Sequence, residues 1–132
     1  PSNVSGTPFD FRKAKTIGQD INCDNVQLKL AGGYDHNYVL NNNGDINKDV
    51  IEVSSSVTGI NMKISTNLPG IQFYAGNMMN THNGKDGKVY HKRSGFALET
   101  QFFPDSIHHI EYPSMILKQG EEKIYLTRYK FM

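Results

Sequence analysis

The chain has 132 residues, enough for one domain with a hydrophobic core of its own. Lys and Arg number 14 and Asp and Glu 13, so the formal net charge is +1, and the longest basic run is His91-Lys92-Arg93. These features argue against nucleic acid or a membrane surface as a partner, and no apolar run approaches the roughly 20 residues of a membrane span. The single cysteine, Cys23, excludes an internal disulfide and a Cys-based zinc cluster and favours a reducing, cytoplasmic location.

The N-terminal residues predict turns rather than regular structure. Gly6 and Pro8 disfavour a strand there, and Asp10 is a candidate cap for a short helical turn that reaches Lys15. The chain begins at Pro1 without an initiator methionine, and residues 1–7 look like a loop. We therefore expect a piece of a longer protein.

The remainder of the chain is dominated by strand patterns. Apolar and polar residues alternate over 26–30 and over parts of 50–54, 57–66, 71–75 and 122–131, and Gly-, Asn- and Pro-containing turns separate these stretches. Short strands at regular spacing predict an all-β fold, an antiparallel β-sandwich or barrel, rather than alternating βα units. Residues 1–132 show no second domain boundary and no internal repeat.

One acidic residue, Glu99, interrupts the apolar strand pattern of residues 94–105. Side chains alternate between the two faces of a strand, so Leu98 and Thr100 share one face while Glu99 and Gln101 share the other. Glutamate is disfavoured in strands, so the position requires a reason. Two interpretations remain open at this stage: a solvated acid at the rim of a sheet, or a carboxylate that lines a polar cavity.

Two other turn-to-strand stretches carry polar and aromatic side chains together. After Gly32-Gly33, the segment 34–40 places Asp35 at the start of a strand, and after Leu68-Pro69-Gly70 a second strand carries Gln72 and Tyr74 on one face. Carboxylates and amides can bind the hydroxyl groups of a sugar while aromatic faces pack on its C–H surfaces. A turn in which Asp35 merely caps nearby amides explains the first stretch equally well.

Other potential sites have simpler explanations. Asp45-Ile46-Asn47-Lys48-Asp49 imitates the start of a calcium loop, but its sixth position is Val50 and its twelfth is Ser56, which predicts a hairpin turn instead. The five histidines show no metal-site spacing, and no Gly-rich phosphate loop or GxSxG motif occurs. The sequence motifs therefore indicate no metal site.

Three segments taken together resemble the aldose 1-epimerase (galactose mutarotase) family: residues 33–38 (GYDHNY), 68–74 (LPGIQFY) and 98–105, which begins LETQ and ends Pro104-Asp105. The opening residues 6–12 and the last strand also resemble that family. The similarity therefore covers the whole chain, but it matches only the C-terminal portion of a member. A complete member is well over twice this length.

The resemblance implies the C-terminal part of a large antiparallel β-sandwich that binds galactose or glucose and interconverts their α and β anomers. It also implies that the reaction uses no metal and no organic cofactor. It assigns Glu99 as the general base and Asp35 and Gln72 as sugar-binding residues. The family's general acid is a histidine, and it lies with another histidine and an arginine in the N-terminal portion, which this chain lacks. None of His36, His82, His91, His108 and His109 matches that position.

The implied partners are an aldohexose and the missing N-terminal portion, supplied in the same polypeptide or as another chain. Two alternatives remain: a carbohydrate-binding module without catalysis, and an epimerase that acts on a hexose 6-phosphate. The lack of an Arg or Lys cluster near the three segments disfavours the second alternative.

Overall fold

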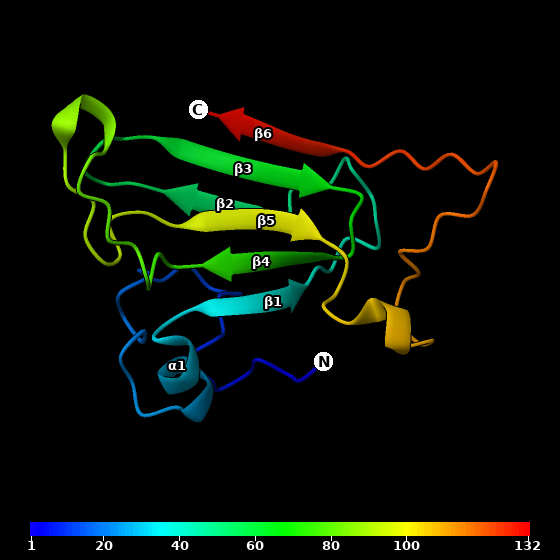
Figure 1. Cartoon of the computed structure of the whole chain (residues 1–132), viewed down its shortest axis with the longest axis horizontal. Coiled ribbons are helices and arrows are strands. Elements are labelled where there is room, and N and C mark those ends of the chain that lie inside the picture. Colours follow the sequence, from blue (N-terminus) through cyan, green and yellow to red (C-terminus); the bar gives the residue numbers. More distant parts are fainter. The chain divides into compact units, whose positions relative to one another are not determined.

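The computed structural model describes all 132 residues, Pro1–Met132. Its strands form two three-stranded sheets, one in the order β1-β4-β5 and the other in the order β2-β3-β6 (Figure 1). The strands are β1 (Asp35–Val39), β2 (Ile51–Ser54), β3 (Asn61–Thr66), β4 (Gly70–Tyr74), β5 (Ala97–Gln101) and β6 (Thr127–Phe131). The helical elements are α1 (Val26–Ala31) and the 3-10 turns η1 (Lys85–Gly87) and η2 (Ser106–His108). None of these helices has the length and apolar character that a membrane span requires.

The β2-β3-β6 sheet is antiparallel throughout. β2 pairs with β3 from Ile51↔Ile64 to Ser54↔Asn61, and β3 pairs with β6 from Met62↔Phe131 to Thr66↔Thr127. β3 is therefore the central strand, and two backbone hydrogen bonds between Asn61 and Met132 close the end of its pairing with β6. The predicted all-β class with antiparallel strands is confirmed.

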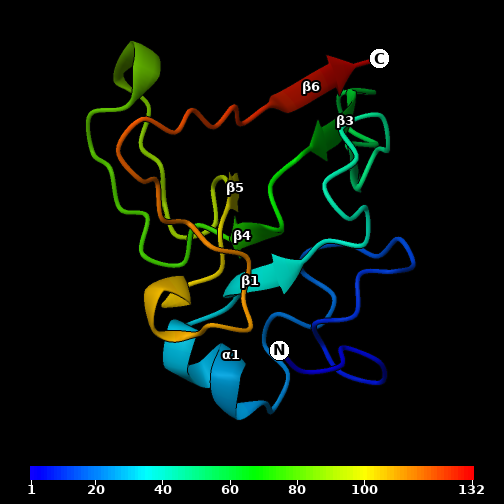
Figure 2. The ribbon, with the colours of Figure 1, turned by 90° about the vertical axis from the view of Figure 1, so that its right-hand side faces the viewer.

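One predicted strand is wrong, because residues 26–31 form the helix α1. The Asn25 side chain accepts hydrogen bonds from the backbone N–H groups of Gln27 and Leu28, and Gly32 ends the helix in the left-handed conformation at φ 69°. Only Leu28 is buried, so the apolar residues on either side of it, Val26 and Leu30, face solvent. Figure 2 shows α1 leading into β1.

The expected helical turn from Asp10 to Lys15 is also wrong. The Asp10 carboxylate accepts hydrogen bonds from the backbone N–H of Arg12 and from its guanidinium, which holds the pKa of Asp10 down at about 2. Lys15 instead donates to the carbonyl oxygen of Pro8 and to Asp20, and its ammonium lies 4.4 Å from the centre of the Phe11 ring. The segment is held by side-chain contacts and not by a helix.

The chain divides into two compact units, residues 1–36 with 72–98 and residues 37–71 with 99–132. The core of the first unit is aromatic. The fully buried Tyr34 stacks on Phe73 with ring centres 5.3 Å apart and meets the edge of Phe11 at 5.1 Å. Its hydroxyl donates to the carbonyl oxygen of Pro8, and burial raises the pKa of Tyr34 to about 12.

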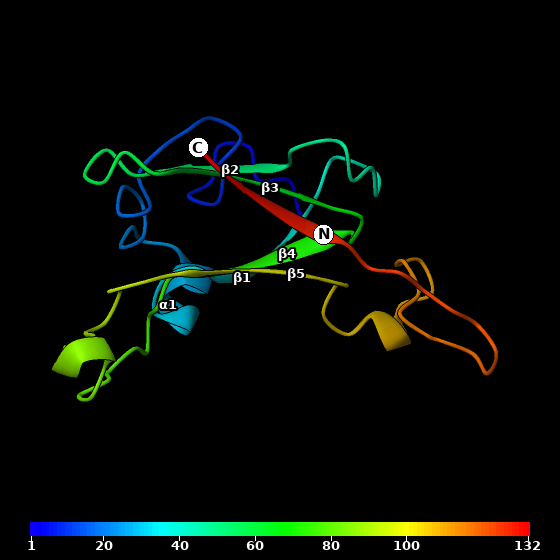
Figure 3. The ribbon, with the colours of Figure 1, turned by 90° about the horizontal axis from the view of Figure 1, so that it is seen from above.

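The second unit is built on β3, where Ile64, Ser65 and Thr66 are buried. The Asn42 side chain donates to the carbonyl oxygen of Thr66 at 2.6 Å and so attaches the preceding turn to this strand. Between β5 and β6 runs a long connection whose only regular element is η2 (Figure 3). The last predicted strand therefore begins at Thr127 rather than near residue 122.

Candidate functional site

The turn before β1 is fixed by close packing against Asn77. Gly33 has φ 143°, and a Cβ atom there would come within 2.9 Å of the side-chain Cγ of Asn77. The Asn77 amide donates to the carbonyl oxygens of Ala31 and Tyr34, one on each side of the two glycines. Asp35 therefore starts its strand from a well-defined backbone position.

Replacing Gly33 by alanine should destabilise the protein by about 3 kcal/mol, because the new methyl group must displace the Asn77 amide and the backbone is strained as well. Gly59→Ala is the matched control: Gly59 also has a positive φ of 73°, but a Cβ atom at this position would meet nothing within 4 Å, so a cost of only about 1 kcal/mol is expected. Urea denaturation measures both. Equal losses for the two variants would contradict the role of Asn77.

Asp35 and Gln72 are in direct contact within the first unit. The Nε2 group of Gln72 on β4 donates to Oδ1 of Asp35 on β1 at 2.7 Å, and both side chains are half-buried. The Oε1 atom of Gln72 is buried without a hydrogen-bond partner. A carboxylate and an amide held together in this way offer acceptors and donors to neighbouring hydroxyl groups of a ligand. Sequence spacing alone did not indicate this contact.

Glu99 lies in the second unit, at the middle of β5, and is exposed. β5 is the last strand in the order β1-β4-β5. The adjacent residue Thr100 is half-buried and directs its hydroxyl to Thr127 of β6 at 2.7 Å. Glu99 consequently extends from the opposite face of β5 as an accessible carboxylate.

His36 is engaged in local structure. Its Nδ1 atom accepts a hydrogen bond from the backbone N–H of Asp35 at 3.0 Å, and its ring lies 4.6 Å from that of Phe9. Burial lowers the pKa of His36, and the nearby carboxylate of Asp35 opposes this effect only in part. The side chain is thus held in its neutral form as an acceptor.

Stability should decrease as the pH falls below about 6.5, the ordinary pKa of histidine, because the unfolded chain then takes up a proton at His36 that the folded chain resists. The contribution of His36 to the free energy of unfolding is constant above this pH. It is lost progressively as the pH falls toward the lower pKa of His36 in the folded state. Urea denaturation from pH 7.5 to 5 should show a shallower decline for His36→Gln than for the parent. His82→Gln, at an exposed histidine, controls for the loss of one imidazole. An NMR titration that placed the pKa of His36 above 6.5 would contradict this explanation.

Two other histidines belong to an exposed acidic cluster in the β5–β6 connection. Asp105 contacts His108 through Nδ1 and His109 through Nε2, and the second nitrogen of His109 lies 3.0 Å from Glu111. A hydrogen bond from its own backbone N–H, and then the contact with His109, lower the pKa of Glu111. The remaining histidines, His82 and His91, are exposed.

The Asp45 segment is a turn, but it is not a hairpin tip, since it joins β1 to β2 in different sheets. The Asp45 carboxylate accepts from the backbone N–H of Asn47 and pairs with Lys48 at 3.7 Å, so its oxygens serve the turn itself.

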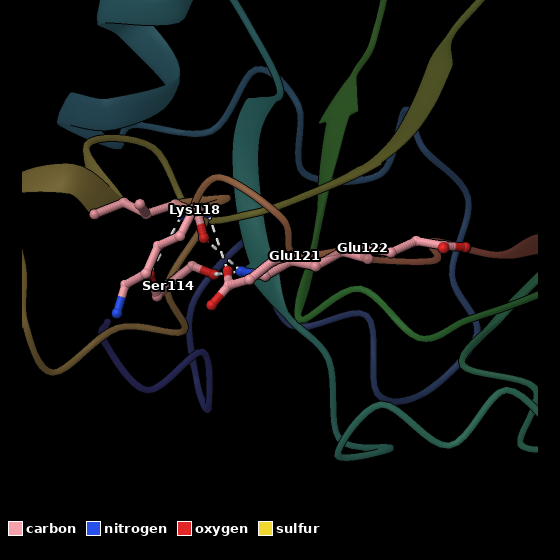
Figure 4. A pocket seen from close by; sticks show the side chains of 6 residues that line it. Ser114, Lys118, Glu121 and Glu122 are labelled. Atoms are coloured by element: carbon pink, nitrogen blue, oxygen red, sulfur yellow. Dashed lines mark hydrogen bonds between the residues drawn. The ribbon is translucent and has the colours of Figure 1, made fainter.

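A surface hollow lies in the β5–β6 connection (Figure 4), and none of the predicted site residues lines it. The Nζ group of Lys123 donates to the carbonyl oxygen of Ile116 at 2.6 Å, and Glu121 accepts from the backbone N–H of Lys118 at 3.0 Å. The charged side chains of Lys123 and Glu121 thus stabilise the β5–β6 connection itself. The hollow is lined by Ser114, Ile116, Lys118, Glu121, Glu122 and Lys123.

Comparison with known proteins places these features in a family. A model of the family described as aldose 1-epimerase matches residues 1–130. The aldose 1-epimerase of Escherichia coli (strain K12) is 39% identical over 132 residues, covering 98% of this chain and 38% of that protein. The galactose mutarotase of Homo sapiens is 37% identical over 129 residues, covering 97% of this chain and 36% of that protein.

The structural comparison agrees. The crystal structure of a GalM/aldose epimerase homologue from C. elegans matches with a TM-score of 0.81 and 25% identity, over 98% of this chain and 38% of that one. The chain thus spans little more than a third of the length of these relatives and matches their C-terminal part.

Proposed function

Since the chain belongs to the aldose 1-epimerase family, we propose that it forms part of an enzyme that interconverts the α and β anomers of aldohexoses such as galactose and glucose. The observation that carries this proposal is the 2.7 Å hydrogen bond between Gln72 and Asp35, at the positions where the family resemblance predicts sugar-binding residues. Relatives named aldose 1-epimerase and galactose mutarotase support the same reaction.

In the proposed mechanism, Asp35 and Gln72 bind sugar hydroxyls and Glu99 acts as the general base. The base removes the proton from the anomeric hydroxyl while an acid protonates the ring oxygen, and the bond between C1 and the ring oxygen breaks to give the open-chain aldehyde. Rotation about C1–C2 presents the other face of the aldehyde, and ring closure with the roles reversed gives the other anomer. The exposure of Glu99 suits a group that must meet a substrate.

The general acid is proposed to come from the N-terminal portion of the enzyme, joined upstream or supplied by another chain. The contacts of His36, His108 and His109 with neighbouring residues support this, because those histidines already serve local structure. The edge strand β6 also exposes Tyr129 by 49% and Phe131 by 67%, apolar surface that a further segment of protein would cover. A cytoplasmic location is part of the proposal, and the lone free thiol of Cys23 is consistent with it.

The test uses the completed enzyme, in which these 132 residues follow the N-terminal portion of the Escherichia coli relative. Polarimetry started from pure α-galactose should show mutarotation well above the spontaneous rate. Galactose binding without anomer exchange, observed by NMR, would instead indicate a carbohydrate-binding module. Exchange of glucose 6-phosphate in strong preference to glucose would indicate the phosphosugar alternative. The isolated 132-residue chain is the reference, and full activity in that chain would refute the assignment of the acid to another segment.

A further inference from the structure

Three threonine hydroxyls join β5 to the other sheet of the second unit. Thr100 on β5 lies 2.7 Å from Thr127 on β6, and Thr127 lies 3.2 Å from Thr66 on β3, measured between the Oγ1 atoms. Thr66 is fully buried and the other two are half-buried. We propose that this threonine triad, Thr66, Thr100 and Thr127, positions Glu99 for catalysis. The inference rests on the proposed function, in which Glu99 is the base.

The order of donors in the triad is determined by its inner end. The Thr66 hydroxyl donates its only proton to the carbonyl oxygen of Leu126 at 2.9 Å, and it accepts from the backbone N–H of Leu68 at 3.1 Å. Thr127 must therefore donate to Thr66, and Thr100 must donate to Thr127. Each hydroxyl donates one hydrogen bond toward the buried end of the triad, so the hydrogen bonds donated by Thr100 and Thr127 each require the next threonine as their acceptor.

The inner end of the triad is rigidly held. Asn67, which follows Thr66, exchanges hydrogen bonds with Leu126: its backbone N–H donates to the Leu126 carbonyl oxygen at 3.2 Å, and its Oδ1 accepts from the Leu126 N–H at 2.9 Å. Its amide also donates to the carbonyl oxygen of Ile124. The triad thus fastens β5 to a segment that cannot shift without breaking several hydrogen bonds.

Glu99 and Thr100 are consecutive residues of β5, so their side chains leave the strand on opposite faces. Anchoring the Thr100 side chain fixes both the position and the rotation of the strand at this point, and thereby the direction in which the exposed Glu99 extends. A general base must stay within hydrogen-bond reach of the proton it removes, and a displacement of about 1 Å can cost up to about 100-fold in rate. The triad restrains the position of Glu99 by holding the opposite face of β5, the face on which Thr100 lies.

The hydrogen-bond order is tested on the 132-residue chain by urea denaturation of Thr100→Val, Thr127→Val and the double variant. Thr100→Val should lower the folding equilibrium constant by about fivefold in the parent but have almost no effect when Thr127 is already valine. Thr81→Val, at an exposed threonine, is the matched control and should leave the constant unchanged. Additive effects of the two substitutions would refute the triad.

Positioning is tested by kinetics in the completed enzyme, per mole of folded protein. Thr100→Val should lower kcat about tenfold, because it removes roughly one hydrogen bond that holds the base in position. KM and the apparent pKa of the pH profile should stay unchanged. Thr100→Ser, which keeps the hydroxyl, should restore most of the rate. If Glu99→Gln lowers kcat but Thr100→Val does not, the inference is wrong and the proposed function stands. If Glu99→Gln itself has no effect, the assignment of the base fails instead.

Discussion

Replacing Glu99 by glutamine should lower kcat for galactose mutarotation by about 10²- to 10⁴-fold, the contribution expected of a positioned general base. Glutamine keeps the size and the hydrogen-bonding reach of glutamate but cannot take up the proton of the anomeric hydroxyl. KM should change little, because Asp35 and Gln72, which pair in the first unit, are the proposed sugar ligands. Polarimetry of the completed enzyme, started from each pure anomer in turn, measures both constants.

The control for this substitution is Glu122→Gln, which removes a carboxylate from the surface hollow of the β5–β6 connection. It should leave kcat unchanged. Both glutamates are exposed, so neither variant should change the free energy of unfolding by more than about 0.5 kcal/mol. A loss of activity would then not result from unfolding. Near-normal turnover by Glu99→Gln would mean that another group is the base.

The strands were predictable where apolar alternation coincides with sheet pairing, as at β3 and β4. The error at residues 26–31 arose because five alternating residues fit a strand and one turn of an amphipathic helix equally well. The deciding signals were present in the sequence: Asn25 can cap the first turn, and Gly32 can end the helix in the left-handed conformation. These flanking residues predict the helix better than the alternation of five residues predicts a strand.

The candidate site was predictable only as separate residues. The family resemblance supplied the proposed roles of Asp35, Gln72 and Glu99, whereas the contact between Asp35 on β1 and Gln72 on β4 follows from the order β1-β4-β5, in which β1 skips the next two strands in sequence. Such long-range pairing has no local signal. The threonine triad is similar: its members are separated by 27 to 61 residues, and an isolated threonine in a strand indicates nothing about a partner.

The largest loss of stability is expected from Tyr34→Ala, at about 3–5 kcal/mol, the range for truncating large aromatic side chains in a core. Tyr34 is fully buried, stacks on Phe73, contacts the ring edge of Phe11 and reaches the carbonyl oxygen of Pro8 through its hydroxyl. Alanine would leave a cavity between these rings and release the N-terminal segment. Urea denaturation of the 132-residue chain measures the effect.

Two matched variants separate the causes. Tyr34→Phe keeps the ring packing and removes only the hydrogen bond to Pro8, so it should cost about 1 kcal/mol. Phe131→Ala truncates an aromatic residue that is 67% exposed on β6 and should change stability by less than about 1 kcal/mol. Tyr34 immediately precedes Asp35, so the alanine variant should also weaken galactose binding in the completed enzyme, whereas the phenylalanine variant should not. Equal losses of stability from Tyr34→Ala and Tyr34→Phe would show that the hydroxyl, and not the ring packing, holds the first unit together.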